Sequence, residues 1–327
     1  MVIDSCGTML LKMEIDRMIV SDLAELGLIS RTLADRRLCG EYMSEVRAST
    51  TQTINKFVTA LDIEPDFGVS IGAALAESGS MTKAVLTNVM VEDFGIDVRA
   101  TPITPLILAV HLLHTSSLIK DVPQQYSATL RRDRPAFHIS HGETDAQLTS
   151  DLLAFSAIGN LGLLKETWGS EKTLAVTQFV TQQVACLVRG RRRDLLENIG
   201  AQTKDLVETA KLKTGSVFAM SIVPPAILAG ANPDKTKDAL LFAEHFGIAY
   251  QILNDLNYAS KKDNPQKDTE LDEENGKITF IESTGSEQNA WNLMQDHANT
   301  AKDHSYQLPG NEVRRNHIIN YILDRKD

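Results

Sequence analysis

Apolar residues recur every three or four positions along most of the sequence, which is the spacing of amphipathic α-helices. An early example places Ile19, Leu23, Leu26 and Ile29 on one helical face. No stretch shows the regular alternation of apolar and polar residues that is typical of a half-buried strand. The predicted helical segments are Ile15–Leu38, Ser49–Leu61, Ile103–Lys120, Asp145–Leu164, Thr173–Asn198, Asp205–Ala231, Asp234–Tyr258 and Gln288–His304, the last of which extends to Leu323 in a longer alternative.

The segment Ile103–Lys120 differs from the others because it is apolar on nearly every side. Thr101-Pro102 and Thr104-Pro105 both fit a helix start, with a capping residue followed by proline in the first turn. A helix that is apolar all round is usually buried. We therefore expect this helix at the centre of the fold.

Composition favours one large helical domain over residues 1–327. With 327 residues, of which 43% are hydrophobic, the chain is long enough to bury a large core. No repeat period and no interdomain linker interrupt it. The one polar low-complexity stretch, Ser260–Gly276, is predicted to be an exposed loop.

Charge and cysteine content exclude several classes of protein. A net charge of −10 and a pI near 5.3 argue against a nucleic-acid partner. Cys6, Cys39 and Cys186 lack the spacing of a zinc site or a disulfide framework, which favours a cytoplasmic location. The run Met9–Leu11 is too short for a signal peptide or a membrane span, because Lys12 follows at once.

Five short motifs follow one another between His114 and Lys277. The first lies in His114–Leu153, where charged and glycine residues interrupt the apolar pattern. Its distinctive residues are His114, Leu118, Ile119, Asp121, Arg131-Arg132, Arg134-Pro135, Gly142-Glu143 and Asp151. The later motifs are GRRRDL at Gly190–Leu195, KTG at Lys213–Gly215, GIAYQILNDLNY at Gly247–Tyr258 and GK at Gly276-Lys277.

In this order the motifs resemble those of the trans-isoprenyl diphosphate synthases, also called polyprenyl synthetases. That family carries a helix with His and a DDxxD motif, then RRGxP, GQxxDL, KTG and a second aspartate-rich motif, GxxFQxxDDxxD. Upstream, SGSMTKA at Ser78–Ala84 falls where the family has GGKRxRP. The resemblance implies an all-α, isoprenoid synthase-type helical bundle around a central cavity, dimeric through a helix face.

The resemblance also implies a reaction. The family ionises an allylic diphosphate, and the resulting carbocation is attacked by isopentenyl diphosphate. Three Mg²⁺ ions, held by the two aspartate-rich motifs, stabilise the departing diphosphate. Hard oxygen ligands suit this metal, so carboxylates are required at both motifs.

This sequence departs from the family at those carboxylates. Asp121 is present in the first motif, but Val122 follows it where the family has a second aspartate. In the second motif Asn254 replaces the leading aspartate, Asp255 remains, and Tyr258 replaces the last one. The candidate metal ligands are therefore Asp121, Asp255 and Asn254, and we expect weak Mg²⁺ binding or none.

The basic half of the implied site is better preserved. By resemblance, the isopentenyl diphosphate ligands are Lys83, His114 and Arg132. On the allylic side Arg131 and Lys267 would hold the diphosphate. The remaining candidates, counted as catalytic residues in the family, are Lys213, Thr214 and Gln251.

Four further features have two interpretations each. Arg191 stands where the family has Gln, so it either enters the cavity as a substitute cation or forms surface ion pairs. Ser116 and Ser117 either leave the cavity floor open to a long prenyl chain or simply permit close helix packing. His111 is expected to be a core residue rather than a ligand. A structural role is likewise favoured for His138 and His141 over a metal site with Glu143.

Three functions fit these residues. The first is a non-catalytic or weakly active subunit of a heteromeric polyprenyl diphosphate synthase, partnered by another polyprenyl synthetase. The second is an active prenyltransferase with unusual metal ligands. The third is a prenyl diphosphate binding protein that needs no metal. The partners are thus an allylic or isopentenyl diphosphate and a second synthetase chain.

Overall fold

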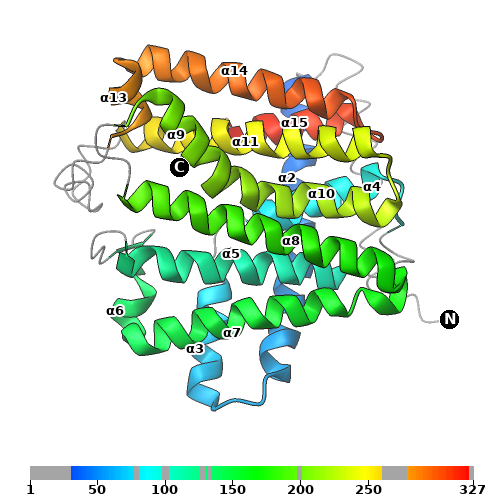
Figure 1. The fold of residues 1–327 in the computed structure, drawn as a ribbon. Coiled ribbons are helices and arrows are strands. Elements are labelled where there is room, and N and C mark those ends of the chain that lie inside the picture. Colours follow the sequence, from blue (N-terminus) through cyan, green and yellow to red (C-terminus); the bar gives the residue numbers. More distant parts are fainter. Residues whose placement is uncertain are drawn as a thin grey trace.

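Helices make up nearly all of the structure, a computed structural model that describes residues 31–76, 81–97, 103–124, 130–131, 134–196, 201–259 and 278–323 (Figure 1). In chain order the elements are α2 (Arg31–Ala60), α3 (Pro65–Ala76), α4 (Thr82–Asp93), α5 (Thr104–Gln124), β1 (Leu130–Arg131), β2 (Arg134–Pro135), α6 (Phe137–His141), α7 (Glu143–Gly162), α8 (Lys165–Leu196), α9 (Thr203–Ala210), the π-helix η1 (Lys211–Gly215), α10 (Ser216–Ala229), α11 (Pro233–Ala259), α13 (Phe280–Thr284), α14 (Glu287–Tyr306) and α15 (Glu312–Leu323). The predicted all-α class is confirmed. Among the described residues, the sheet structure is one antiparallel ladder with two residues in each strand.

The middle of the bundle is built on α10 and α5. Of the fourteen residues of α10, twelve are buried, and this helix packs against α4, α8 and α11. Pro224 and Pro225 lie inside α10 without ending it. The continuous stretch Thr203–Ala229 is long and apolar enough to cross a membrane, but 78% of its most apolar window is covered by the rest of the fold. Its apolarity is therefore that of a core helix.

The prediction of a buried, apolar central helix is confirmed by α5. Its residues from Leu106 to Leu113 are all buried, and it packs against α7 along much of its length. Thr104 opens the helix and Pro105 occupies its first turn, as predicted. Thr101-Pro102 lies outside the described residues.

A buried ion pair fastens the C-terminal helix to the end of α4. The Arg315 guanidinium donates to Asp93 Oδ2 at 2.6 Å, and both side chains are 1% exposed. Arg314 Nη2 donates to the other oxygen of Asp93 at 2.9 Å. The same oxygen accepts the backbone N–H of Asn311 at 2.9 Å. We call this group the Asp93 centre.

Several predicted boundaries need correction. Ser49–Leu61 is not a separate helix, because α2 runs without a break from Arg31 to Ala60. The predicted Asp205–Ala231 helix contains a π-turn at its KTG motif. Helices α3 and α4 were missed, and α4 is buried on so many sides that it shows no amphipathic period. Most of Ile15–Leu38 and the Ser260–Gly276 stretch lie outside the described residues.

Candidate diphosphate site

The family motifs meet on one side of the bundle. Helices α5 and α11 both end at the left of Figure 1, which brings the two aspartate-rich segments to the same end of the molecule. The π-helix η1 carries the KTG motif and packs against both α8 and α11. A π-turn is a rare local geometry that often marks a functional position.

Glycines allow three backbones to touch around the KTG turn. A Cβ atom on Gly190 of α8 would lie 2.4 Å from the backbone nitrogen of Lys213. A Cβ on Gly247 of α11 would lie 2.4 Å from the Cα of Gly215. No side chain larger than hydrogen fits at either crossing. The turn that presents Lys213 and Thr214 is therefore clamped between two helices, and we call this the KTG junction.

Lys213 is held by a carboxylate of α8. Its ammonium donates to Asp194 Oδ2 at 2.6 Å, with 19% of the lysine side chain and 8% of the aspartate side chain exposed. Asp194 is the aspartate of the GRRRDL motif. The ion pair joins two motifs that lie nineteen residues apart.

A chain of hydrogen bonds continues from the KTG turn to the second aspartate-rich motif. The Thr214 hydroxyl donates to Gln251 Oε1 at 2.9 Å. Gln251 Nε2 donates in turn to Asp255 Oδ1 at 3.3 Å. The other oxygen of Asp255 accepts the backbone N–H of Phe280, the first residue of α13, at 3.2 Å. Both oxygens of Asp255 are thus engaged by the protein itself.

Asn254 and Asp255 lie half-buried on α11, and the side chain of Tyr258 lies outside the described residues. In the first motif, Asp121 falls within α5, but its side chain also lies outside the described part, as does that of Arg131. Arg132 and Lys267 lie wholly outside it. Among the described residues, no three His, Cys, Asp or Glu side chains are grouped to hold a metal ion. Mg²⁺ binding by Asp121, Asn254 and Asp255 therefore stays a prediction.

Known proteins share both this fold and the motif order. The sequence model of the family described as "Polyprenyl synthetase" matches residues 71–307. This chain belongs to the polyprenyl synthetase family. It is 29% identical over 260 residues to a geranylgeranyl diphosphate synthase of Pseudescherichia vulneris, covering 77% of this chain and 83% of that one. A farnesyl diphosphate synthase of Geobacillus stearothermophilus is 24% identical over 249 residues, which cover 73% of this chain and 82% of that one.

Solved structures agree on the fold. A geranyltransferase from Legionella pneumophila superimposes with a TM-score of 0.75, covering 89% of this chain and 98% of that one, at 18% sequence identity. At that identity the likeness shows the fold alone. Membership of the polyprenyl synthetase family thus rests on the sequence match.

Lys83, an expected diphosphate ligand of this family, contacts two aromatic rings. Its ammonium lies 4.9 Å from the ring centre of Phe218 and 5.6 Å from that of Tyr250. Cation–π attraction favours this placement. His111 is close enough that the charge of Lys83 contributes to its lowered pKa, after the larger effect of burial. His111 is buried with Nε2 3.1 Å from the Leu75 carbonyl, as expected of a core histidine.

The other candidates of the first motif lie on α5. His114 is half-buried, whereas Ser116 and Ser117 are buried. The Ser116 hydroxyl lies 2.9 Å from that of Ser150 on α7, and the Ser117 hydroxyl donates to the His114 carbonyl at 2.7 Å. These contacts are those expected of small residues that permit close packing of α5 on α7.

The arginine run of α8 divides between the core and the surface. Arg191 is only 9% exposed, whereas Arg192 is exposed and Arg193 donates to the Thr209 hydroxyl at 3.3 Å. Arg191 is therefore largely covered by the fold, one turn before Asp194, and its entry into the cavity stays a prediction. His141 has Nδ1 3.2 Å from the Ser70 hydroxyl, consistent with its expected structural role.

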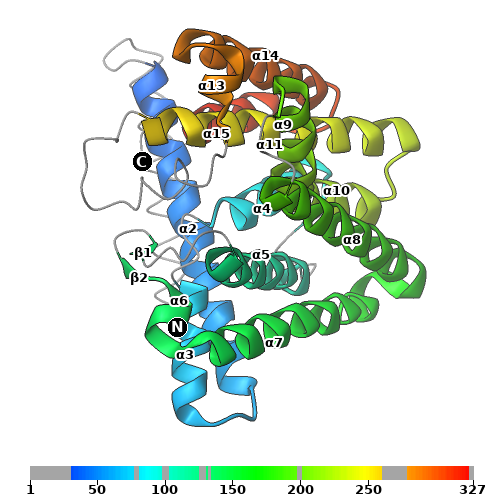
Figure 2. The ribbon, with the colours of Figure 1, turned by 60° about the vertical axis from the view of Figure 1, so that its left-hand side comes forward.

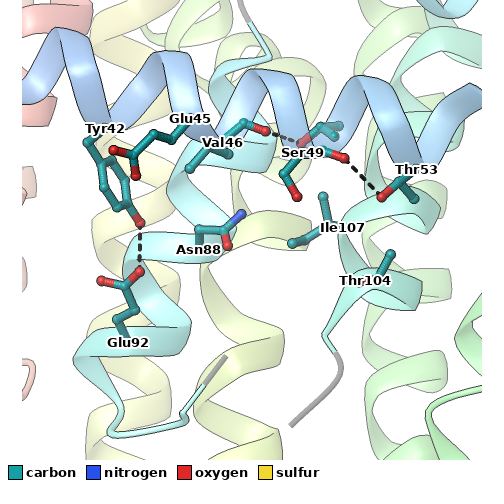
Figure 3. A pocket seen from close by; sticks show the side chains of 10 residues that line it. Tyr42, Glu45, Val46, Ser49, Thr53, Asn88, Glu92, Thr104 and Ile107 are labelled. Atoms are coloured by element: carbon teal, nitrogen blue, oxygen red, sulfur yellow. Dashed lines mark hydrogen bonds between the residues drawn. The ribbon is translucent and has the colours of Figure 1, made fainter. Parts of the chain in front are cut away.

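A polar pocket of about 190 Å³ lies away from this site, between α2, α4 and the start of α5 (Figure 3). Tyr42, Glu92 and Thr104 are among its lining residues. Burial, followed by the charge of Glu92, raises the pKa of the Tyr42 phenol. Thr104 precedes Asp121 by seventeen residues, which corresponds to about 25 Å of helix. This pocket therefore lies far from Asp121 and the first aspartate-rich motif.

Proposed function

We propose that this polyprenyl synthetase is a non-catalytic or weakly active subunit of a heteromeric polyprenyl diphosphate synthase. The chain is isoprenyl diphosphate synthase-like in sequence and fold, and the family acts on allylic and isopentenyl diphosphates. The finer proposal concerns catalysis and partnership, and it is supported by the state of Asp255 and by the outer surface of the bundle.

The observation that carries the proposal is the internal use of Asp255. Ionising an allylic diphosphate leaves nearly three negative charges on the departing group, and Mg²⁺ ions need several carboxylates to stay beside it. In the second motif Asn254 is neutral, and Asp255 already accepts hydrogen bonds on both oxygens. A metal ion at Asp255 would compete with the Gln251 and Phe280 donors for the two carboxylate oxygens.

An exposed apolar surface supports the partnership. Eight of the twelve large hydrophobic side chains that are exposed in the described part lie between α6 and the end of α8. Figure 2 shows α7 and α8 along one side of the bundle. On α7, Leu148 and Phe155 are two turns apart and therefore share a face. Apolar surface gathered in this way is typical of a protein–protein interface.

The test is co-expression with an intact polyprenyl synthetase from the same organism. We expect a stable complex by size exclusion with light scattering, and a product length that differs from that of the intact synthetase alone. Phe155→Lys places a charge on the exposed surface of α7 and should abolish the complex. Val69→Lys is the matched control, because Val69 is 73% exposed on α3 while Phe155 is 77% exposed.

Complex formation and turnover test the two parts of the proposal separately. Absence of a complex, or a complex that tolerates Phe155→Lys as well as Val69→Lys, contradicts the partnership. Steady chain elongation by the purified chain alone contradicts the loss of catalysis and favours the active prenyltransferase instead.

A further inference from the structure

The carboxylate of Asp194 forms an ion pair with Lys213, the lysine that by resemblance to the family would bind diphosphate. Its Oδ2 atom lies 2.6 Å from the Lys213 ammonium, the distance of a strong charge-assisted hydrogen bond. Asp194 is 8% exposed in its side chain, so solvent screens the pair only in part. Lys213, at 19% exposure, remains reachable from outside.

We infer that Asp194 is an internal counter-ion that competes with diphosphate for Lys213. The inference rests on the proposed diphosphate role of Lys213, but it does not depend on whether the chain is catalytic. The Lys213 ammonium has three N–H donors, so a diphosphate oxygen that binds it lies beside Asp194 Oδ2 on the same cation. Two anions beside one ammonium repel each other, so Asp194 weakens binding of a metal-free diphosphate.

The surroundings of Asp194 strengthen this inference. Arg191 precedes it by one helical turn on α8 and is buried at 9% exposure. Arg191 therefore adds a second positive charge to the part of α8 that carries Asp194. The clamp formed by Gly190 and Gly247 fixes the Lys213 backbone, so the turn cannot carry the ammonium away from Asp194. Competition, rather than displacement of the whole turn, is the expected consequence.

Neutralising Asp194 tests this inference. Calorimetry with inorganic pyrophosphate, in the presence of a metal chelator, should show binding to Asp194→Asn that is roughly tenfold tighter than to the unaltered chain. The gain should shrink as salt is added, because it is electrostatic. Asp303→Asn is the matched control, since Asp303 is exposed on α14 and the same charge is removed. It should leave the affinity unchanged.

A second pair of variants keeps the test valid if Asp194→Asn does not fold. Lys213→Gln leaves the aspartate uncompensated and should weaken pyrophosphate binding. Adding Asp194→Asn to Lys213→Gln creates a neutral amide pair, which avoids a buried unpaired charge. The double variant should bind more tightly than Lys213→Gln alone.

Two results contradict the inference. One is an affinity for pyrophosphate that Asp194→Asn leaves unchanged or weakens while the protein stays folded. The other is a double variant that binds no better than Lys213→Gln. Neither result bears on the proposed partnership, which is measured by complex formation.

Discussion

The Asp93 centre and the Lys213–Asp194 pair use the same chemistry for different ends. Each joins a basic side chain to an aspartate at 2.6 Å. At the Asp93 centre both partners are 1% exposed, and Arg315 also donates to the Pro309 carbonyl and the Ser305 carbonyl. Lys213, in contrast, is partly exposed and is the first residue of the KTG motif. A closed network stabilises the fold, whereas an open pair leaves a charge that a ligand can reach.

We therefore expect changes at the Asp93 centre to affect mainly stability, and changes at the Lys213–Asp194 pair to affect mainly diphosphate binding. Loss of one partner leaves an uncompensated charge, and the cost is larger at Asp93, which is 1% exposed, than at Asp194, which is 8% exposed. The changes below are ordered from the largest expected effect on stability to the smallest.

Arg315→Met should lower the free energy of unfolding by about 3–5 kcal/mol, because it leaves Asp93 buried with too few donors. The measurement is denaturant unfolding of the purified chain. Lys213→Met is the comparison and should cost less, about 1–3 kcal/mol, because the Asp194 carboxylate that it leaves behind is 8% exposed and regains some contact with water. Equal losses at the two positions would show that the Lys213 pair is as structural as the Asp93 centre.

Gly247→Ala should lower the free energy of unfolding by about 1–3 kcal/mol, because its methyl group has no room beside Gly215. Pyrophosphate binding should weaken at the same time, since the KTG turn must shift. Gly159→Ala on α7 is the control: nothing lies within 4 Å of its Cβ position, and Ala should be tolerated or stabilising. A Gly247→Ala protein that matches Gly159→Ala in both measurements would refute the clamp.

The contact between α11 and α14 contains three histidines, so its contribution to stability should depend on pH. His245 Nδ1 lies 2.9 Å from His297 Nδ1, and His304 lies beside them with Nδ1 3.1 Å from Asp238. Burial, then the charges of His297, His304 and Lys211, lower the pKa of His245 from 6.5 to about 4. The pKa of His297 is lowered as well, mainly by burial.

The direction of the pH dependence follows from these lowered pKa values. Between pH 6.5 and about 4 the unfolded chain binds protons that the folded chain does not, so stability should fall as the pH falls through this range. Unfolding free energies measured at several pH values check this, and His245→Asn should flatten the decline. A decline of the same steepness in His245→Asn would assign it to other groups.

The sequence predicted most of the helical framework because long amphipathic helices carry a readable period. It missed α4, whose residues are buried on too many sides for such a period. Pro224 and Pro225 lie within a helix predicted over Asp205–Ala231, where packing on all sides outweighs their local cost.

The candidate site was predictable in its residues but not in its pairings. Thr214 and Gln251 were both expected in it, and the structure joins them directly. The partner of Lys213 was missed, because a contact between α8 and η1 depends on the glycine crossing rather than on local spacing. The Phe280 donor to Asp255 was missed because a long polar segment separates the two residues in the sequence. Arg132 and Lys267 stay predictions.

The loss of metal-supported catalysis is tested most directly by turnover of the purified chain alone. The assay supplies an allylic diphosphate, radiolabelled isopentenyl diphosphate and Mg²⁺, and it measures incorporation of the label into longer prenyl products. We predict no elongation above background, with elongation restored when the partner synthetase is added. Rapid Mg²⁺-dependent elongation by the chain alone, abolished by Asp121→Ala, would contradict the account.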